Sequence, residues 1–233
     1  MRHGRLAAPS LCLLATTLIL LPACSHSSLT SALPSGAALL RQASRTMAGV
    51  TSARFSLQVK GTIGGLAVRK AEGVLTSDGK ASGTADLEEV GTLIEFDVVI
   101  VNGTVYVKGP TGGFAQIPQA LTGGFYDPTK LLDPHTGLSR LLATSNAART
   151  VGTEDVGGTS AYQVNATLDG QVLSALIPVP ANKDAPSVLW IGTDTPHLVQ
   201  VKATLPPEGS GPPTVVTVGL SDFGIPATIT PPA

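Results

Sequence analysis

Residues 53–61 read ARFSLQVKG, and this stretch decides the fold class. Its apolar residues, Phe55, Leu57 and Val59, alternate with polar residues at every intervening position. A strict period of two is typical of a β-strand that has one face in an apolar environment and the other in water. We therefore expect an antiparallel sheet with one buried face.

Turn signals connect this strand to others. The segment TSDGK (76–80) separates the two predicted strand segments 66–75 and 81–90, and its Asp-Gly pair suits a tight hairpin. Asn102-Gly103, the strongest short-range hairpin signal, joins residues 92–101 to residues 104–109. Further strands are expected within residues 148–168, around a turn at Gly157-Gly158, and within residues 186–205 and 213–224.

The helical patterns are few and short. Residues 35–50 place Leu39 or Leu40, Ala43, Met47 and Val50 on one helical face, and the residue at position 35 is a serine that can cap the helix. Residues 169–178 predict a second short helix, which ends at a proline.

Two Asp-Pro pairs, Asp127-Pro128 and Asp133-Pro134, predict two more short helices in the middle of the chain. Aspartate suits the N-cap of a helix and proline suits its first position, so each pair forms a coherent helix start. The second helix would present an apolar stripe of Leu138, Leu141 and Leu142.

Residues 36–233 contain no linker long enough to divide them into two domains. With five Phe, three Tyr and one Trp in the chain, the core must consist mainly of Val, Leu, Ile and Ala. The prediction is one α+β domain, a large curved antiparallel sheet with helices gathered against one face.

Residues 1–23 have the three parts of an export signal: basic Arg2 and Arg5, the apolar run LCLLATTLILL (11–21), and the small residue Ala23. The alternative, an uncleaved membrane anchor, fits less well because this run is short for a bilayer core about 30 Å thick. After cleavage the chain keeps one cysteine, Cys24, which therefore has no internal disulfide partner.

The segment LPAC (21–24) resembles a bacterial lipobox, with leucine three positions before the cysteine, although Pro22 is an unusual middle residue. The resemblance implies that Cys24 receives the lipid. Two or more acyl chains there would hold the protein stably on a membrane, on a polar tether of residues 24–35.

No catalytic or metal-binding pattern stands out. Asp133, His135 and Ser139 could be drawn as a triad, but a capped helix start with exposed polar residues explains them better. His197 is expected to face solvent in a hairpin turn. Residues 24–233 carry 13 Lys and Arg against 16 Asp and Glu, a charge of −3, which does not favour nucleic-acid binding. We expect no enzyme activity, no cofactor and no metal.

The apolar strand faces allow two arrangements: helices that fill the concave side of the sheet as a solid core, or helices that roof it and leave a cavity. The small residues Ala81, Gly83 and Ala85 in one strand allow empty volume. The residue pattern alone leaves both arrangements open.

Four segments together resemble the LppX/LprA/LprF/LprG family of mycobacterial and related actinobacterial lipoproteins, and the LprG branch most. They are YDPTKLLDPHTGLSRLL (126–142), VGTEDVGGTSAYQV (151–164), PSVLWIGTDTPHLVQVKATL (186–205) and LSDFGIPATITPP (220–232). The resemblance covers essentially the whole chain. Phe223, where relatives commonly have Trp, and the long turn LPPEGSGPP (205–213) depart from the pattern.

This resemblance implies a half-barrel sheet whose concave side, covered by helices, surrounds a hydrophobic cavity for acyl chains. Members are carriers of triacylated glycolipid, lipoarabinomannan or triacylglycerol toward the outer envelope, anchored on the periplasmic side of the cytoplasmic membrane. Implied partners are an efflux transporter of the major facilitator type and, for pathogens, host Toll-like receptor 2. An anchored adaptor without cargo is the alternative function, and a lipid hydrolase would need a nucleophile that the sequence does not reveal.

The candidate cavity residues are the inward-facing members of the predicted elements, and Ala85 also aligns loosely with a strand that lines the cavity in the family. A single β-bulge would exchange the two faces. The set comprises Phe55, Leu57, Val59, Ala85, Leu87, Ile94, Phe96, Val98, Ile100, Leu138, Leu141 and Leu142.

Overall fold

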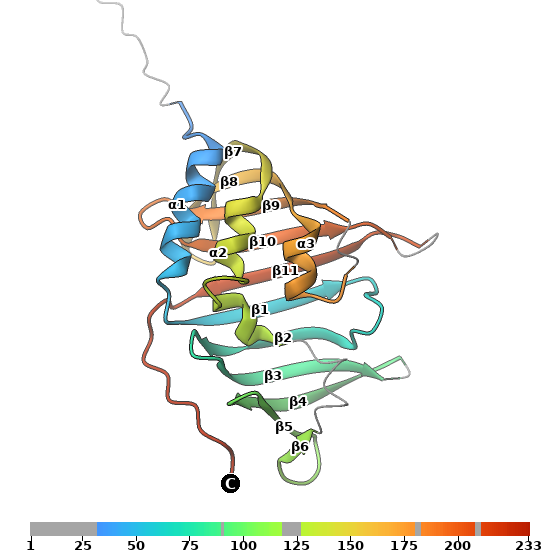
Figure 1. Ribbon diagram of the computed structural model, residues 1–233. Helices are drawn as coiled ribbons and strands as arrows, with labels where there is room; N and C mark the ends of the chain where they lie inside the picture. The colour runs from blue at the N-terminus through green and yellow to red at the C-terminus, as the bar shows by residue number, and fades with distance from the viewer. Residues whose placement is uncertain (1–31, 90, 118–126, 180–182, 208–210) are drawn as a thin grey trace, which may run out of the picture. The chain divides into compact units, whose positions relative to one another are not determined.

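Eleven strands form a single antiparallel sheet in the order β6-β5-β4-β3-β2-β1-β11-β10-β9-β8-β7 (Figure 1). The computed structural model describes residues 32–89, 91–117, 127–179, 183–207 and 211–233, and the compact unit is Leu33–Ala233. The strands are β1 (Ser52–Lys60), β2 (Val68–Thr76), β3 (Lys80–Glu89), β4 (Thr92–Val101), β5 (Thr104–Lys108), β6 (Ala115–Ile117), β7 (Asn146–Val156), β8 (Thr159–Leu168), β9 (Ala185–Gly192), β10 (Leu198–Leu205) and β11 (Thr214–Ser221).

Strand β1 alternates as the sequence predicts. Phe55, Leu57 and Val59 are buried, and the polar residues between them are exposed. We call the face that carries these three side chains the inner face and the opposite face the outer face. The hairpin at Asn102-Gly103 also forms as expected, and both residues have positive φ, as a type I′ turn requires.

The helices lie on the inner face. They are α1 (Gly36–Ala48), the 3-10 helix η2 (Pro128–Leu132), α2 (Leu138–Thr144) and α3 (Gly170–Leu176). Helix α1 contacts β7 and β9, α2 contacts β8, and η2 contacts β2 and β3. Figure 1 shows the three α-helices over the half of the sheet that includes β8 to β11, and no described helix over β4 to β6. The predicted α+β domain with a large antiparallel sheet is confirmed.

The two Asp-Pro pairs behave differently. Asp127 caps η2 as predicted, because its side chain accepts a hydrogen bond from the Thr129 backbone at 3.0 Å. The helix predicted at Asp133-Pro134 instead begins at Leu138, after a turn. The turn folds back so closely that a Cβ at Gly137 would lie 2.5 Å from the carbonyl oxygens of Asp133 and Leu131.

Two smaller expectations were wrong, and one strand was missed. Ser35 occupies the N-cap position of α1, but its side chain makes no capping hydrogen bond. The short strand β6 was not foreseen. His197 does not point freely into solvent, because its ring stacks on that of Phe223, with centroids 4.1 Å apart and planes 11° apart.

Two glycines bring β2 and β3 unusually close together. Gly73 and Gly83 are direct cross-strand partners. A Cβ on Gly73 would lie 2.2 Å from the Ser82 carbonyl oxygen, and one on Gly83 would lie 2.0 Å from the Glu72 carbonyl oxygen. Any side chain at either position would collide with backbone, so this pair needs glycine to keep the local curvature of the sheet.

We predict that Gly83→Ala lowers the free energy of unfolding by about 1–3 kcal/mol, because the neighbouring strand must move away. The matched control is Gly152→Ala in β7, where an added Cβ meets nothing within 4 Å. Urea unfolding of both variants measures the difference. Equal stability of the two variants would contradict the close approach.

Desolvation lowers the pKa of His197 below its ordinary value of 6.5. The unfolded chain therefore binds a proton at this residue more readily than the folded chain. As the pH falls through 6.5 toward the lower folded-state pKa, the free energy of unfolding must decrease, and it levels off below that pKa.

The effect is measured as the change in the free energy of unfolding between pH values on either side of 6.5. We expect His197→Gln to lose less stability over this window than the wild-type chain. A pH dependence that is identical in both proteins would show that His197 titrates normally.

Candidate functional site

One half of the inner face is fully packed. Leu138, Leu141 and Leu142 of α2 are buried, with exposed fractions of 2%, 3% and 2%, and they belong to the main hydrophobic core. Leu57 and Val59 of β1 are buried in the same core. In this half the helices cover the apolar surface of the sheet.

The other half of the inner face keeps apolar side chains that are only partly buried, although Phe96, Val98 and Val105 among them pack against the edge of the main core. The register pairs Val98 with Gly83, Phe96 with Ala85 and Ile94 with Leu87, so these β4 residues share the inner face. Val105 and Val107 of β5 continue it, opposite Ile100 and Val98. We call Ile94, Phe96, Val98, Val105 and Val107 the open apolar face; all five are half-buried.

A small pocket lies where the packed half meets the open apolar face. Its floor consists of short side chains, chiefly Ala71, Ala81 and Ala85, and Pro128 of η2 contributes to its wall. The free volume is about 30 Å³, room for one or two water molecules. Its lining is Phe55, Val68, Ala71, Glu72, Ala81, Ser82, Gly83, Thr84, Ala85, Val98, Ile100 and Pro128.

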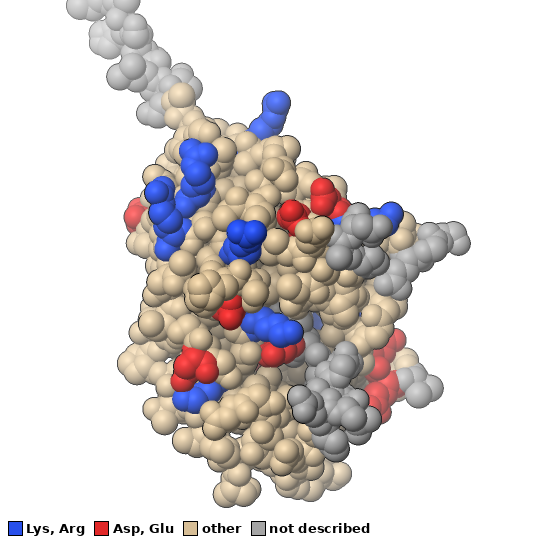
Figure 2. Space-filling view, viewed as in Figure 1, with Lys and Arg blue, Asp and Glu red and all other residues tan. Residues whose placement is uncertain are grey.

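Charged groups are sparse and of mixed sign on the helix-bearing side of the molecule. Figure 2 shows isolated Lys, Arg, Asp and Glu residues separated by wide uncharged areas, with no concentrated basic patch on this view. The described ion pairs include Arg69–Glu88 and Lys108–Asp97, both at least partly exposed. An apolar pocket with such surroundings suits an uncharged hydrocarbon ligand better than an ion.

The triad suggested by Asp133, His135 and Ser139 does not form. The Ser139 hydroxyl is buried and donates to the Pro134 carbonyl oxygen at 3.0 Å, whereas His135 is exposed. Asp133 accepts hydrogen bonds from the backbones of His135 and Thr136, and these donors lower its pKa. Contrary to expectation, Ser139 is not an exposed polar residue, but its bond is structural.

Within the described ranges no group of three or more His, Cys, Asp or Glu residues could hold a metal ion. Across the same part of the chain, no helix has the length and hydropathy needed to cross a bilayer.

Comparison with known proteins places this geometry in a family. The sequence profile of the LppX_LprAFG lipoproteins matches residues 35–229. The chain belongs to this family. The resemblance seen in its sequence segments is therefore confirmed.

Three LppX_LprAFG relatives show how far the similarity extends. The lipoarabinomannan carrier protein LprG of Mycolicibacterium smegmatis is 34% identical over 98% of both chains. The crystal structure of LprF from Mycobacterium bovis superposes with a TM-score of 0.72 at 21% identity, over 85% of this chain and 97% of that one. LppX from Mycobacterium tuberculosis gives 0.63 at 19%, over 83% and 97%. The two structures share the fold.

The family fold distributes the predicted cavity residues over three places. Phe55, Ala85, Val98 and Ile100 line the pocket. Ile94 and Phe96 lie on the open apolar face beside it, and Leu87 is buried opposite Ile94. The remaining five, Leu57, Val59, Leu138, Leu141 and Leu142, lie in the packed core. Cys24 lies outside the described residues.

Sequence reasoning missed several pocket residues. Val68 and Ala71 of β2 line the pocket, but the register shifts between Val68 and Lys70, which breaks the alternation that would have revealed them. Pro128 was assigned only to a helix start. Val105 and Val107 do alternate in the sequence TVYVK and could have been assigned to the inner face.

We predict unequal costs for two alanine substitutions. Leu142→Ala should lower the free energy of unfolding by about 2–5 kcal/mol, because it leaves a cavity in a packed core. Phe96→Ala should cost less than Leu142→Ala, although phenylalanine is larger, because its ring is only partly buried at the edge of the core. Urea unfolding measures both. If Phe96→Ala cost as much as Leu142→Ala, the open apolar face would be part of the packed core.

Proposed function

We propose that this chain is a non-enzymatic carrier that holds the acyl chains of a lipid or lipoglycan against the inner face of its sheet. The observation that carries the proposal is the open apolar face, which continues from a pocket floored by alanine and glycine. Partly exposed apolar side chains beside an apolar pocket form a surface that a hydrocarbon ligand can cover.

Hydrocarbon burial supplies the binding energy without any catalytic group. Each methylene moved from water to an apolar surface contributes about 0.8 kcal/mol, so one acyl chain laid along β4 and β5 gains several kcal/mol. The ligand covers Phe96, Val98 and Val107 in return. This gain also offsets the work of widening a pocket whose free volume is now about 30 Å³.

The cargo class follows from the relatives. Several family members are named lipoarabinomannan carrier proteins, and one of them matches nearly the full length of this chain. An acylated glycolipid or lipoglycan therefore suits the site. Triacylglycerol is a second acylated candidate, with transfer directed toward the outer envelope.

Anchoring would come from Cys24, lipidated after removal of residues 1–23, which holds the domain on the periplasmic side of the cytoplasmic membrane. The family resemblance also implies two partners: an efflux transporter of the major facilitator type and, in a pathogen, Toll-like receptor 2, which would recognise the acylated end. An anchored adaptor without cargo is the competing function, and it would have a solid core.

Lipid extraction separates the carrier from the adaptor. The full chain is expressed in an actinobacterial host that processes lipoproteins, purified in detergent, and extracted with organic solvent, which releases only lipid that is not covalently bound. We expect diacyl or triacyl lipid in stoichiometric amount by mass spectrometry. Repeated recovery of protein without such lipid would favour the adaptor.

Ala85→Trp tests the location of the cargo. The indole is larger than the free volume of about 30 Å³, so it would occupy the pocket between β2, β3 and η2 and push its walls apart. In protein that circular dichroism shows to be folded, the bound lipid should fall to less than about half of the wild-type amount. The matched control is Asp86→Trp, on the outer face of the same strand, which should keep its lipid. An undiminished lipid load in Ala85→Trp would remove this pocket from the binding site.

A further inference from the structure

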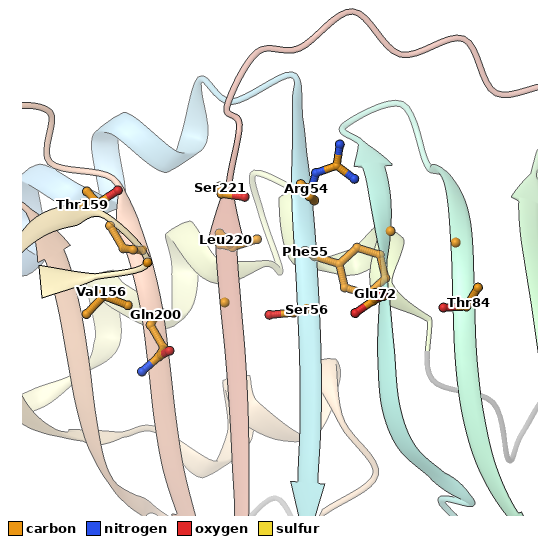
Figure 3. A pocket seen from close by; sticks show the side chains of 15 residues that line it. Arg54, Phe55, Ser56, Glu72, Thr84, Val156, Thr159, Gln200, Leu220 and Ser221 are labelled. Atoms are coloured by element: carbon orange, nitrogen blue, oxygen red, sulfur yellow. The ribbon is translucent and has the colours of Figure 1, made fainter. Parts of the chain in front are cut away.

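The outer face carries a groove that the acyl-binding proposal does not use. Its free volume is about 620 Å³, much larger than that of the inner pocket. Figure 3 looks onto it with the helices behind the strands, and labels lining residues that include Arg54, Ser56, Thr84 and Gln200.

The groove follows one straight cross-strand row. Gln200 of β10 pairs with Gly219 of β11, Gly219 with Ser56 of β1, Ser56 with Glu72 of β2, and Glu72 with Thr84 of β3. Since neighbouring strands lie about 4.8 Å apart, the row spans roughly 19 Å. Gly219 carries no side chain, and the Ser56 hydroxyl lies beside it, because a Cβ at position 219 would come within 2.7 Å of that hydroxyl.

The row presents hydrogen-bonding groups that are not engaged within the protein. Among the described residues, the side chains of Ser56, Thr84, Gln200 and Ser221 have no hydrogen-bond partner. Hydroxyl and amide groups can each donate and accept, so they suit a ligand rich in hydroxyl groups.

Both charged side chains of the groove are already paired. Arg54 Nε donates to Asp222 Oδ2 at 3.0 Å, and Glu72 accepts from Lys70 Nζ at 3.1 Å. The groove therefore offers no unbalanced charge to an ionic ligand, and a neutral ligand fits better.

One side of the groove is built by the end of the β7–β8 hairpin. Val156 packs on an outer-face cluster of Ala161, Trp190 and Val199, and the Trp190 Nε1 donates to Glu154 Oε2 at 2.8 Å. These contacts hold the hairpin end beside β10, where Figure 3 shows Val156 and Thr159 near Gln200. The wall is thus fixed by packing and does not depend on a ligand.

A second hollow, of about 330 Å³, continues the groove to the ends of the strands. The two share Thr159, Val199 and Leu220 in their lining. The stacked rings of His197 and Phe223 line this second hollow, together with the carboxylate of Asp194.

The turn that carries Phe223 is held in a conformation that few residues adopt. Asp222 has φ of 50°, and the turn is tied to β1 by the Gly224 backbone, which donates to the Ser52 carbonyl oxygen at 2.8 Å. Strained backbone of this kind costs free energy and often marks a functional position. Here it holds the Phe223 ring near the end of the groove that contains the row from Gln200 to Thr84.

We propose that this outer-face groove binds a neutral oligosaccharide, with one sugar ring against the His197–Phe223 stack and the following sugars along the row from Gln200 to Thr84. Sugars combine an apolar CH face, which stacks on aromatic rings, with hydroxyl groups at their edges. A stack followed by unengaged hydroxyl and amide groups matches both features.

The test uses mannotetraose and maltotetraose, which lack acyl chains, with the full chain purified in detergent. Saturation-transfer NMR detects binding, and calorimetry gives the affinity. Phe223→Ala removes one ring of the His197–Phe223 stack, and Gly219→Val places a side chain in the middle of the row. Each should weaken binding by about tenfold or more, which corresponds to about 1.4 kcal/mol.

One control variant and one alternative variant keep the outcome interpretable. Lys202→Ala, on the exposed side of β10 but outside the lining, should bind the sugars as the wild-type chain does. If Phe223→Ala unfolds, the double variant Ser56→Ala with Gln200→Ala removes two unengaged groups without touching the stack, and it should weaken binding as well.

The groove and the acyl site lie on opposite faces, so either proposal can fail alone. Ala85→Trp should lose lipid and keep sugar binding, whereas Phe223→Ala should keep its lipid. The proposal is overturned if neither sugar binds at millimolar concentration, or if binding is indifferent to Phe223→Ala, Gly219→Val and the double variant. Binding abolished only by Ala85→Trp would also overturn it, because the sugar would then occupy the inner face.

Discussion

Among the described residues, three α-helices cover only part of the inner face of an eleven-stranded sheet (Figure 1), and the rest of the structure depends on this mismatch. Helices α1, α2 and α3 belong to the half of the sheet around β7 to β11, where the core is packed. Beyond the 3-10 helix η2, the apolar side chains of β4 and β5 are only half-buried. This is the surface on which we propose that a hydrocarbon ligand lies.

Small residues at the boundary between the two halves make the site adaptable. Ala71, Ala81 and Ala85 keep the floor low, and the Gly73–Gly83 pair lets β2 and β3 approach more closely than any side chain would allow. The same two glycines belong to the lining of the outer groove. The sheet is therefore at its thinnest where the inner pocket and the outer groove lie back to back.

Local patterns predicted much of this fold. The alternation of Phe55, Leu57 and Val59, the Asn102-Gly103 hairpin and the apolar stripe of α2 all depend on neighbours in sequence, and all were read correctly. The helix start at Asp133-Pro134 was not, because Gly137 folds the chain back onto the carbonyl groups of η2 first. The outer row from Gln200 to Thr84 could not be foreseen, since it depends on the registers of four strand pairs, one of which, β1 with β11, joins distant parts of the chain.

The central claim is that acyl chains lie on the open apolar face. A diacyl lipid that carries a diazirine on one acyl chain, loaded into the protein and photoactivated, tests it directly, with the cross-linked peptides mapped by mass spectrometry. We predict cross-links on β3, β4 and β5, at inward positions such as Ala85, Phe96, Val98 and Val107. Cross-links confined to the outer face, or spread over the surface without preference, would contradict this account.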